Sequence, residues 1–432
     1  MLADVLGRLP PSSLAASRCV RKHWCSIIDA RRLLRADLLP LRLDAFFCTS
    51  LDHIDRMTYF FARPSTARRI RLDLIHERYY DREVDDHCNG LLLVCGCYMV
   101  VNPATRQWAN LPTSPEPSIG DMLGGVRVWA GTTTDQDQDE ENDDHHLLYP
   151  RFHLVYDPMA ESPQHFEVFL IPFLDHGLGN RENITIDIEE QEWPPSTLRI
   201  HVFSSRRWRW EERSWVRQGE PAGTMADMLQ SDCWDHKAVY FRGALYVHCQ
   251  NDSIMRIALS NDKYQMMKSP ATCGKLGGGT DATFHLGKSE KGTNISLPPL
   301  LANRRPLVHS GFADDEWRVI RDYNNKEEVP PAAAHGDDEF AAADDEWDFD
   351  NADIVLDEAK DEADGHYYPV DFLGFHPYKE IVFFCVPSGT ISYNLNTSKF
   401  QQLGGRINIP VAGMSSCFPY TPCWIRGLFE NS

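Results

Sequence analysis

Cysteine, histidine and acidic residues are the side chains of this sequence that could hold a metal ion. The sequence has 12 cysteines, but Cys95 and Cys97 are the closest pair, and no C-x-x-C arrangement of the kind used by zinc ribbons or fingers occurs. The cluster Asp143-Asp144-His145-His146 lies in a polar segment without a second ligand set, which favours a solvated acidic loop. We therefore expect no metal and no cofactor, and we expect most thiols to be buried like small apolar side chains.

Catalytic motifs are equally sparse. Paired carboxylates occur at Glu211-Glu212 and at Asp314-Asp315-Glu316, but acid pairs at strand ends usually face water. No G-x-S-x-G, H-E-x-x-H, Walker or G-x-G-x-x-G element occurs, and Gly277-Gly278-Gly279 is not followed by Lys-Ser/Thr or by a helical pattern. The sequence thus indicates a protein that is not an enzyme.

A stripe of aromatic and basic residues could bind RNA. It consists of Trp208 and Trp210, interleaved with Arg206, Arg207, Arg209 and Arg213. Alternation with a period of two puts the tryptophans on one face of a strand and the arginines on the other, whereas a stacking platform needs exposed aromatics. The pattern favours a strand with one buried face and one solvated face.

The formal net charge of -20 belongs to two segments of the chain. Residues 135–144 carry seven acids and no base, and residues 337–364 carry fourteen acids and one base, so the rest of the chain is formally neutral. We expect an acidic loop at 135–146 and an acidic disordered insertion at 337–364. Because no basic surplus remains, we expect no nucleic-acid partner.

Neither a membrane span nor a signal peptide is predicted. No apolar run approaches the 18 or more residues that a span needs, and Arg8, Arg18 and Arg21 interrupt the apolar residues near the N-terminus. We expect a soluble protein with no membrane partner, located in the cytoplasm, the nucleus or both.

The first 42 residues must form a unit of their own. Leu2, Val5, Leu6 and Leu9 share one face of a helix that ends at Pro10-Pro11. A second helical run follows Ser12-Ser13, and its apolar positions are Leu14, Cys19, Val20, Trp24, Ile27 and Ile28. Because about 40 residues can hardly bury their own apolar stripe, this helical unit is expected to dock on a partner.

From residue 43 to 428 the pattern changes to short strands separated by turns, which predicts a mainly β body. The expected strands include 91–94, 98–101, 107–111, 152–156, 198–203, 238–241, 244–249, 254–258, 264–267, 380–385, 391–395 and 400–403. Turns that we assign to the outer strands fall near Asn102, Asp157, Ser204, Ser260 and Asn396, with spacings of 47 to 56 residues and a last gap near three such units. This period predicts a propeller of six or seven blades, with a pair of β-sandwiches as the alternative.

The N-terminal unit resembles the F-box motif. The resemblance runs from Leu2 to Asp29 and is carried by Leu9-Pro10-Pro11-Ser12-Ser13-Leu14 and Arg18-Cys19-Val20-Arg21-Lys22-His23-Trp24. The body is similar to the F-box-associated, propeller-like region of plant F-box proteins. The segments that carry this similarity are His87-Cys88-Asn89-Gly90-Leu91-Leu92-Leu93, residues 101–108, residues 241–247 and residues 376–382.

This resemblance implies a substrate-recognition subunit of a Skp-cullin-F-box ubiquitin ligase. The F-box would bind a Skp-type adaptor and, through it, a cullin, while the body would bind an unknown target protein. The adaptor-binding residues that the resemblance implies are Leu2, Val5, Leu6, Leu9, Pro10, Leu14, Val20 and Trp24.

One departure from the family pattern leaves an alternative open. F-box sequences usually open with a Leu-Pro pair that helps to grip the adaptor, whereas this sequence starts at Met1 inside the first helix. Either residues upstream are missing from the sequence or the adaptor contact is weakened. The alternative function is therefore a propeller-like interaction scaffold without ligase assembly, and a propeller enzyme is the third and least favoured hypothesis.

We also expect the chain ends to close the ring. Residues 44–48 form a strand-like run directly after the helical unit, and this run could complete the last blade at 380–403.

Overall fold

We describe the fold from a computed structural model of the 432-residue chain. The residues described are 2–6, 17, 21–31, 45–50, 58–62, 84–94, 99–115, 148–158, 160, 162, 164–174, 190–229, 237–249, 253–268, 275–276, 280–281, 286, 318–320, 371–376, 380–386, 389–397, 399–404, 414–425 and 428–429. The two acidic segments predicted at 135–146 and 337–364 lie outside these residues.

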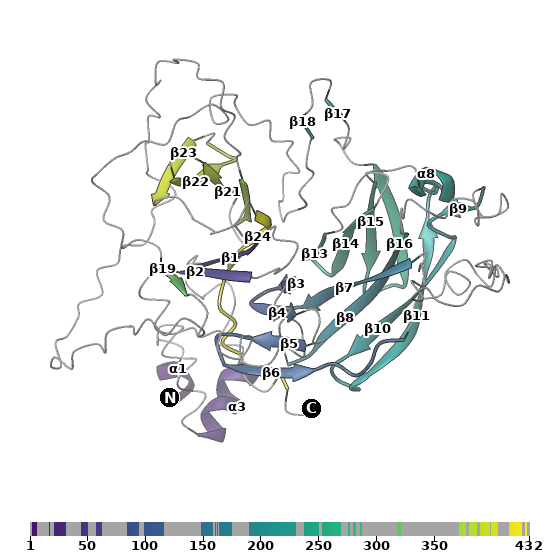
Figure 1. Cartoon of the computed structure of the whole chain (residues 1–432). Coiled ribbons are helices and arrows are strands. Elements are labelled where there is room, and N and C mark those ends of the chain that lie inside the picture. Colours follow the sequence, from purple (N-terminus) through teal and green to yellow (C-terminus); the bar gives the residue numbers. More distant parts are fainter. Residues whose placement is uncertain are drawn as a thin grey trace, which may run out of the picture.

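Two helices lie at the N-terminus, outside the β-rich body (Figure 1). They are α1 (Leu2–Leu6) and α3 (Lys22–Ala30). Leu6 and Ile28 are fully buried between the helices, and Leu2, Trp24 and Ile27 pack against them. Both helices lie within the helical runs that the apolar periodicity predicted, but they are shorter than those runs, and the F-box unit at 1–42 is described only in part.

The rest of the described chain is mainly β, as predicted, and much of it consists of four-stranded antiparallel meanders. The first has the order β3-β4-β5-β6, with β3 (Val84–Cys88), β4 (Leu91–Val94), β5 (Met99–Asn102) and β6 (Gln107–Asn110). The last has the order β20-β21-β22-β23, with β20 (Asp371–Phe375), β21 (Ile381–Val386), β22 (Gly389–Asn394) and β23 (Lys399–Gly404).

Two further meanders join into one eight-stranded sheet. The first contributes β7 (Leu148–Tyr156), β8 (Phe166–Leu174), β10 (Thr197–Ser204) and β11 (Arg209–Gln218). The second contributes β13 (Ala238–Phe241), β14 (Ala244–His248), β15 (Ser253–Ala258) and β16 (Lys263–Lys268). They meet where β11 pairs with β16 in parallel, at Val216 and Lys263. The sheet curls into a nearly closed barrel around one apolar core, and short elements flank it: β9 (Glu192–Trp193), β12 (Gly223–Thr224) and α8 (Met225–Leu229) (Figure 1).

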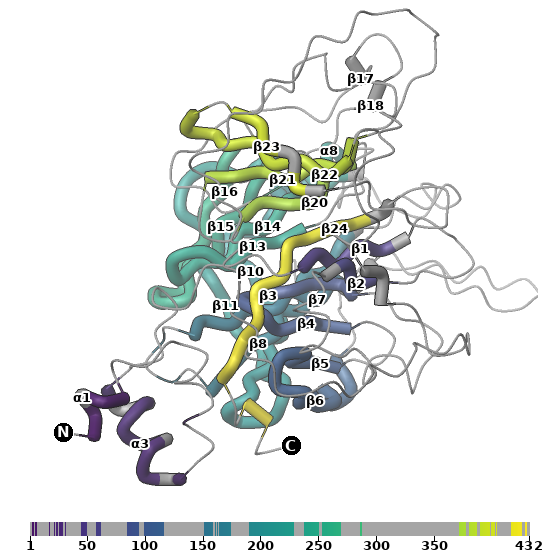
Figure 2. The backbone as a smooth tube through the Cα atoms, turned by 90° about the vertical axis from the view of Figure 1, so that its left-hand side faces the viewer, coloured from purple at the N-terminus to yellow at the C-terminus, as the bar shows by residue number. Residues whose placement is uncertain are grey.

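The remaining larger sheet brings distant parts of the chain together. Its order is β19-β2-β1-β24, from β1 (Ala45–Ser50), β2 (Thr58–Ala62), β19 (Arg318–Ile320) and β24 (Met414–Tyr420). Figure 2 shows the yellow C-terminal strand β24 beside the purple N-terminal strand β1. The two strands pair antiparallel, with Ala45 opposite Tyr420. The chain ends therefore do close a sheet, but the sheet is separate from β20–β23, contrary to our expectation. A small hairpin of β17 (Lys275–Leu276) and β18 (Thr280–Asp281) completes the described strands.

The positions of the turns explain why the predicted spacing of blades was only partly correct. A left-handed residue stands immediately before three of the outer strands, namely Arg106, Trp208 and Asp262, with φ of 58°, 55° and 52°. The turn at Asp157, however, joins β7 to β8 inside the same meander that contains the Ser204 turn. The predicted period therefore counted one unit twice. Among the described strands, six or seven separate blades are not seen, and two of the meanders share a sheet.

Each sheet is joined to the next one in space by a cluster of buried apolar side chains. One cluster lies between β20–β23 and the β1 sheet, a second between the β1 sheet and β3–β6, and a third between β3–β6 and the β7 side of the eight-stranded sheet. The core inside the eight-stranded sheet continues the series. Trp208 and Trp210 pack against the cluster between β3–β6 and the β7 side of the eight-stranded sheet. Both rings contact Phe203, while Arg209 stays exposed, as the alternation predicted.

The described cysteines behave as predicted. Cys48, Cys88, Cys249, Cys385, Cys417 and Cys423 are all buried free thiols. Burial raises the pKa of Cys249 to about 12 and raises that of Cys48 as well, so these thiols stay protonated and apolar. No helix among the described residues is long and apolar enough to cross a membrane.

Candidate functional site

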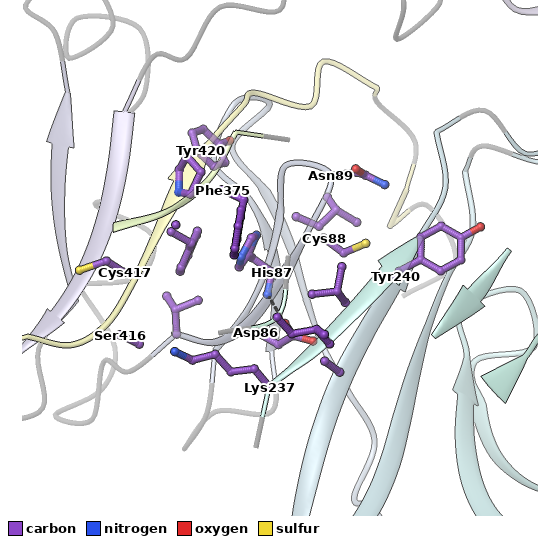
Figure 3. Close-up of a pocket in the computed structure, with 18 of the residues that line it drawn as sticks. Asp86, His87, Cys88, Asn89, Lys237, Tyr240, Phe375, Ser416, Cys417 and Tyr420 are labelled. Atoms are coloured by element: carbon purple, nitrogen blue, oxygen red, sulfur yellow. Dashed lines mark hydrogen bonds between the residues drawn. The ribbon is translucent and has the colours of Figure 1, made fainter. Parts of the chain in front are cut away.

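A cavity of about 150 Å³ lies where one edge strand from each of the five four-stranded units meets the others. Its walls come from β3, β7, β13, β20 and β24 and from the residues that flank these strands. Figure 3 shows His87 beside Asp86, with Lys237 and Ser416 on one side and Asn89 and Tyr240 on the other. The cavity is therefore built from segments spread over more than 300 residues of sequence.

The polar wall of the cavity begins with Asp86 on β3. The pairing of β3 with β4 shifts register between Val84 and Asp86. The Asp86 carboxylate accepts hydrogen bonds from the backbone N–H of His87, at 2.8 Å, and of Leu154 on β7, at 2.7 Å. The Asp86 carboxylate thus accepts a hydrogen bond from a backbone N–H of β7, which a neighbouring strand would otherwise accept. It links β3 to β7 while the two strands remain in separate sheets.

The contact between β3 and β7 continues at the start of the β3–β4 turn. The Cys88 thiol donates to the Tyr156 carbonyl at 3.3 Å and accepts from the Tyr156 N–H at 3.4 Å. The Asn89 side-chain amide donates to the same carbonyl at 2.7 Å. The hydroxyl of Tyr240 on β13 then donates to Asp157 at 2.8 Å, so β13 is fixed to the end of β7. Burial and the Asp157 carboxylate together raise the pKa of Tyr240, which keeps its hydroxyl protonated as a donor.

The C-terminal segment covers the turn between β3 and β4. Asn89 and Gly90 both have positive φ, of 47° and 88°, as a two-residue hairpin turn requires. A Cβ on Gly90 would lie 2.6 Å from the backbone nitrogen of Cys423, so glycine is also needed for this close approach. The His87 ring stacks in parallel on Phe418 of β24, with centroids 3.8 Å apart. These contacts bring β24 onto the β3 side of the cavity.

Two buried histidines line the described part of the cavity, His153 on β7 and His376 after β20. His153 is 3% exposed, and its Nε2 has no hydrogen-bond partner. Its Nδ1 lies 3.9 Å from a carboxylate oxygen of Asp86, too far for a hydrogen bond. Burial and the nearby Arg151 cation lower the pKa of His153 to about 3, so the imidazole is neutral at physiological pH.

The described part of the cavity suits recognition of a ligand. The carboxylate of Asp86 and the thiol of Cys88 are already used in joining β3 to β7. Among the described residues no three His, Cys, Asp or Glu side chains are grouped to hold a metal ion. Aromatic side chains of Phe372, Phe375 and Phe418 line the opposite wall. Lys237 and Asp85 line the cavity as well, so its wall carries charged as well as apolar side chains.

The adaptor-binding residues that the F-box resemblance implies lie elsewhere, in the N-terminal helices. Of these, Leu2, Leu6 and Trp24 meet in the small core between α1 and α3. Val5 points outward and is 55% exposed. Four further residues implied by the resemblance lie outside the described residues, namely Leu9, Pro10, Leu14 and Val20. The structure therefore does not test their role.

The sequence analysis did not find the cavity as a site. The resemblance to the F-box-associated region begins at His87 and leaves out Asp85 and Asp86. So many polar residues directly before the buried strand Leu91–Val94 could have indicated a functional wall. No sequence signal points to His153. It is a single histidine in an apolar strand, and its place at the cavity depends on the packing of β7 against β3.

Comparisons with known proteins give one distant relationship. The chain is 29% identical over 131 residues to a protein of Arabidopsis thaliana whose name assigns it to the F-box proteins. The match covers 26% of this chain and 32% of the relative, so the chain spans about a third of the length of that protein. No protein-family model matches the sequence. No solved structure matches the chain.

Proposed function

We propose that this chain is the substrate-recognition subunit of a Skp-cullin-F-box ubiquitin ligase in the cytoplasm, the nucleus or both. The N-terminal helices bind a Skp-type adaptor, and the β-rich body binds a target protein. The subunit makes and breaks no bond itself. It holds lysines of the target near a recruited conjugating enzyme and so raises their effective concentration.

The similarity to an F-box protein of Arabidopsis thaliana is the observation that carries this proposal. The motif-like residues between Leu2 and Asp29 support it independently. The helices add a physical reason, because Leu6 and Ile28 are buried between them while Val5 on the same short helix is 55% exposed. An exposed apolar side chain beside a small core is a suitable contact for a partner protein.

The body supports a propeller-like plan for the target-binding part. Four-stranded meanders are the usual blades of propellers, and here one edge strand from each of five four-stranded units lines a common cavity. Neighbouring units are joined by successive apolar clusters, as adjacent blades would be. In this plan the eight-stranded sheet corresponds to two neighbouring blades whose outer strands have come into contact.

Capture of the chain by a purified Skp-type adaptor tests the proposal. We expect the wild-type chain to be retained and Val5→Asp to weaken retention at least tenfold, because a charge would be buried in the contact. Val216→Asp is the matched control, since Val216 is 56% exposed but lies on β11 in the body. Leu9→Ala and Trp24→Ala should also abolish detectable capture, since truncating a large anchor costs about 2 to 4 kcal/mol of binding free energy.

The contrary results are equally specific. If Val5→Asp and Val216→Asp are captured equally well, the N-terminal helices do not form the adaptor contact. If no Skp-type adaptor retains the wild-type chain, the ligase function is wrong and an interaction scaffold takes its place.

A further inference from the structure

Three buried thiols lie together in the apolar cluster between β20–β23 and the β1 sheet. They are Cys48 on β1, Cys417 on β24 and Cys385 on β21, and all three are free. Thiols that adjoin one another have a chemistry that a single buried cysteine lacks, because two of them can be joined in a disulfide. The geometry of the strands decides which two.

Cys48 and Cys417 are the pair that the sheet brings together. They stand directly opposite each other in the antiparallel pairing of β1 with β24. Opposite residues in such a ladder have Cα atoms about 4.5 to 5.5 Å apart, within the range of about 4.4 to 6.8 Å that a disulfide needs. Both side chains lie on the same face of the sheet and in the same apolar cluster. The Cys48 thiol is hydrogen-bonded to the Cys417 thiol, so the two sulfur atoms already adjoin.

The place of this pair in the fold gives a bond between them a consequence. In the order β19-β2-β1-β24, strand β24 lies at the edge and has β1 as its neighbour in the sheet. The same strand supplies Phe418, which stacks on His87 and lines the cavity. The loop that the bond would close spans most of the chain, and cross-links that close long loops constrain the unfolded chain most. A Cys48–Cys417 bond would therefore fix one wall of the cavity.

We propose that Cys48 and Cys417 are a redox-sensitive pair, which a small-molecule disulfide such as oxidised glutathione converts into a cross-strand disulfide. The Cys417 thiolate attacks one sulfur of the small molecule, forms a mixed disulfide and releases one thiolate. The Cys48 thiolate then attacks the Cys417 sulfur of the mixed disulfide and releases the second. The two protein thiols give up one proton each, and the two released thiolates take these protons up. Two protein thiols are thus oxidised, and one small-molecule disulfide is reduced to two thiols.

The edge position of β24 provides the route for this reaction. In the paired sheet Cys48 is 0% exposed and Cys417 is 7% exposed. Burial raises the pKa of Cys48, and a buried protonated thiol is inert. Separation of β24 from β1 exposes the Cys417 thiol, and such local opening costs less free energy than global unfolding. When β24 pairs with β1 again, Cys48 is brought to the mixed disulfide and completes the exchange.

Disulfide mapping of the full-length wild-type chain tests the pairing. The reduced chain is incubated with oxidised glutathione at about pH 8, where an exposed thiol is partly ionised. The remaining thiols are then alkylated, and the digested chain is analysed by mass spectrometry. We expect the main intramolecular disulfide to join the peptide of Cys48 to the peptide of Cys417, and dithiothreitol to release it.

Hydrogen exchange measures what the bond does to the fold. We expect the backbone amides of β24 to exchange at least about tenfold more slowly in the oxidised chain than in the reduced one, because the disulfide opposes the opening of this edge strand. The amides of β14 provide the internal control. This strand lies inside the eight-stranded sheet, away from the pair, so its exchange should be the same in both forms.

Matched variants identify the thiols that take part. Cys48→Ala and Cys417→Ala should each abolish the disulfide. Cys249→Ala should retain it, since Cys249 is a buried free thiol in the separate core inside the eight-stranded sheet. Cys385→Ala should also retain it, because Cys385 belongs to the same cluster but lies on another sheet. Mapping of the wild-type chain keeps the test valid if a variant fails to fold.

Each contrary outcome overturns a defined part of the inference. Recovery of Cys48 and Cys417 as alkylated thiols after oxidation would rule out the redox-sensitive pair. A disulfide between Cys48 and Cys385 would show that the exchange occurs between sheets and that the proposed pairing is wrong. Equal exchange of the β24 amides in the oxidised and reduced chains would mean that the bond does not fix this wall of the cavity. None of these results depends on whether a Skp-type adaptor captures the chain.

Discussion

Two four-stranded antiparallel units of this protein are assembled in opposite ways. Strands β13–β16, one half of the eight-stranded sheet, follow one another between residues 238 and 268 with only a few residues between successive strands. The β19-β2-β1-β24 sheet instead combines residues 45–62 with residues 318–320 and 414–420. The first unit can form early from local contacts, whereas the second must wait until both ends of the chain meet and their loop entropy has been lost.

The difference matters for the cavity. Both units contribute a wall, β13 from the local unit and β24 from the non-local sheet. The cavity is complete once the non-local sheet has formed, so its binding properties depend on contacts between distant segments. Four predictions test this comparison, in order of decreasing expected effect.

Phe47→Ala should have the largest effect, because Phe47 holds the non-local sheet together. Its ring is 1% exposed and contacts Phe60 of β2 and Phe418 and Tyr420 of β24, at centroid distances of 4.7, 5.3 and 5.2 Å. We expect the free energy of unfolding to fall by about 3 to 5 kcal/mol, measured by urea denaturation with tryptophan fluorescence. A loss below about 1 kcal/mol would mean that β1 is not part of the core.

Gly90→Ala and Gly243→Ala form a matched pair in two similar hairpin turns. Both glycines have positive φ, of 88° and 75°, and each follows another residue with positive φ. A Cβ on Gly90 would lie 2.6 Å from the Cys423 nitrogen, while a Cβ on Gly243 would meet nothing within 4 Å.

We expect Gly243→Ala to cost about 1 kcal/mol of stability for its backbone conformation. Gly90→Ala should cost about 1 to 3 kcal/mol more, because the C-terminal segment must move. Thermal and urea denaturation of the two variants provide the check. Equal losses would show that the segment around Cys423 does not press on the turn.

His153 should make the stability of the folded chain depend on pH. Its pKa is about 3 in the folded chain, against about 6.5 in an unfolded one. Between these values the unfolded chain binds a proton that the folded chain excludes, so stability that is present above pH 6.5 is lost as the pH falls towards 3.

The slope from this one group should approach about 1.4 kcal/mol per pH unit within that window. Urea denaturation at pH 7, 6, 5 and 4 should show the slope in the wild-type chain and a smaller one, by about this amount, in His153→Phe. Identical slopes for the two proteins would mean that His153 accepts a proton in the folded state.

Val216→Ala should have the smallest effect, within about 0.5 kcal/mol. Val216 is 56% exposed and stands opposite Lys263 where the two meanders of the eight-stranded sheet meet. Backbone pairing, not its side chain, joins the strands there. A loss above about 1 kcal/mol in urea denaturation would indicate that this junction has an apolar contact of its own.

Much of the local structure could be predicted from the sequence alone. The strands at Leu91–Val94 and Ala238–Phe241 have the bounds that the apolar runs and turn residues indicated. The helices around Leu6 and Ile28 follow from the spacing of apolar residues. These features depend on neighbours a few residues away, because side-chain alternation, helical periodicity and turn chemistry all act over short distances.

The tertiary structure decided the features that depend on distant partners. The parallel junction of β11 with β16, the pairing of β1 with β24 and the place of His153 in the cavity wall have no local sequence signal. A strand with two buried faces fits several neighbours equally well, and which one it meets is selected by the packing of the whole chain. The sequence therefore determined where the strands and turns are, and the cavity with its unsatisfied histidine arose when those strands packed together.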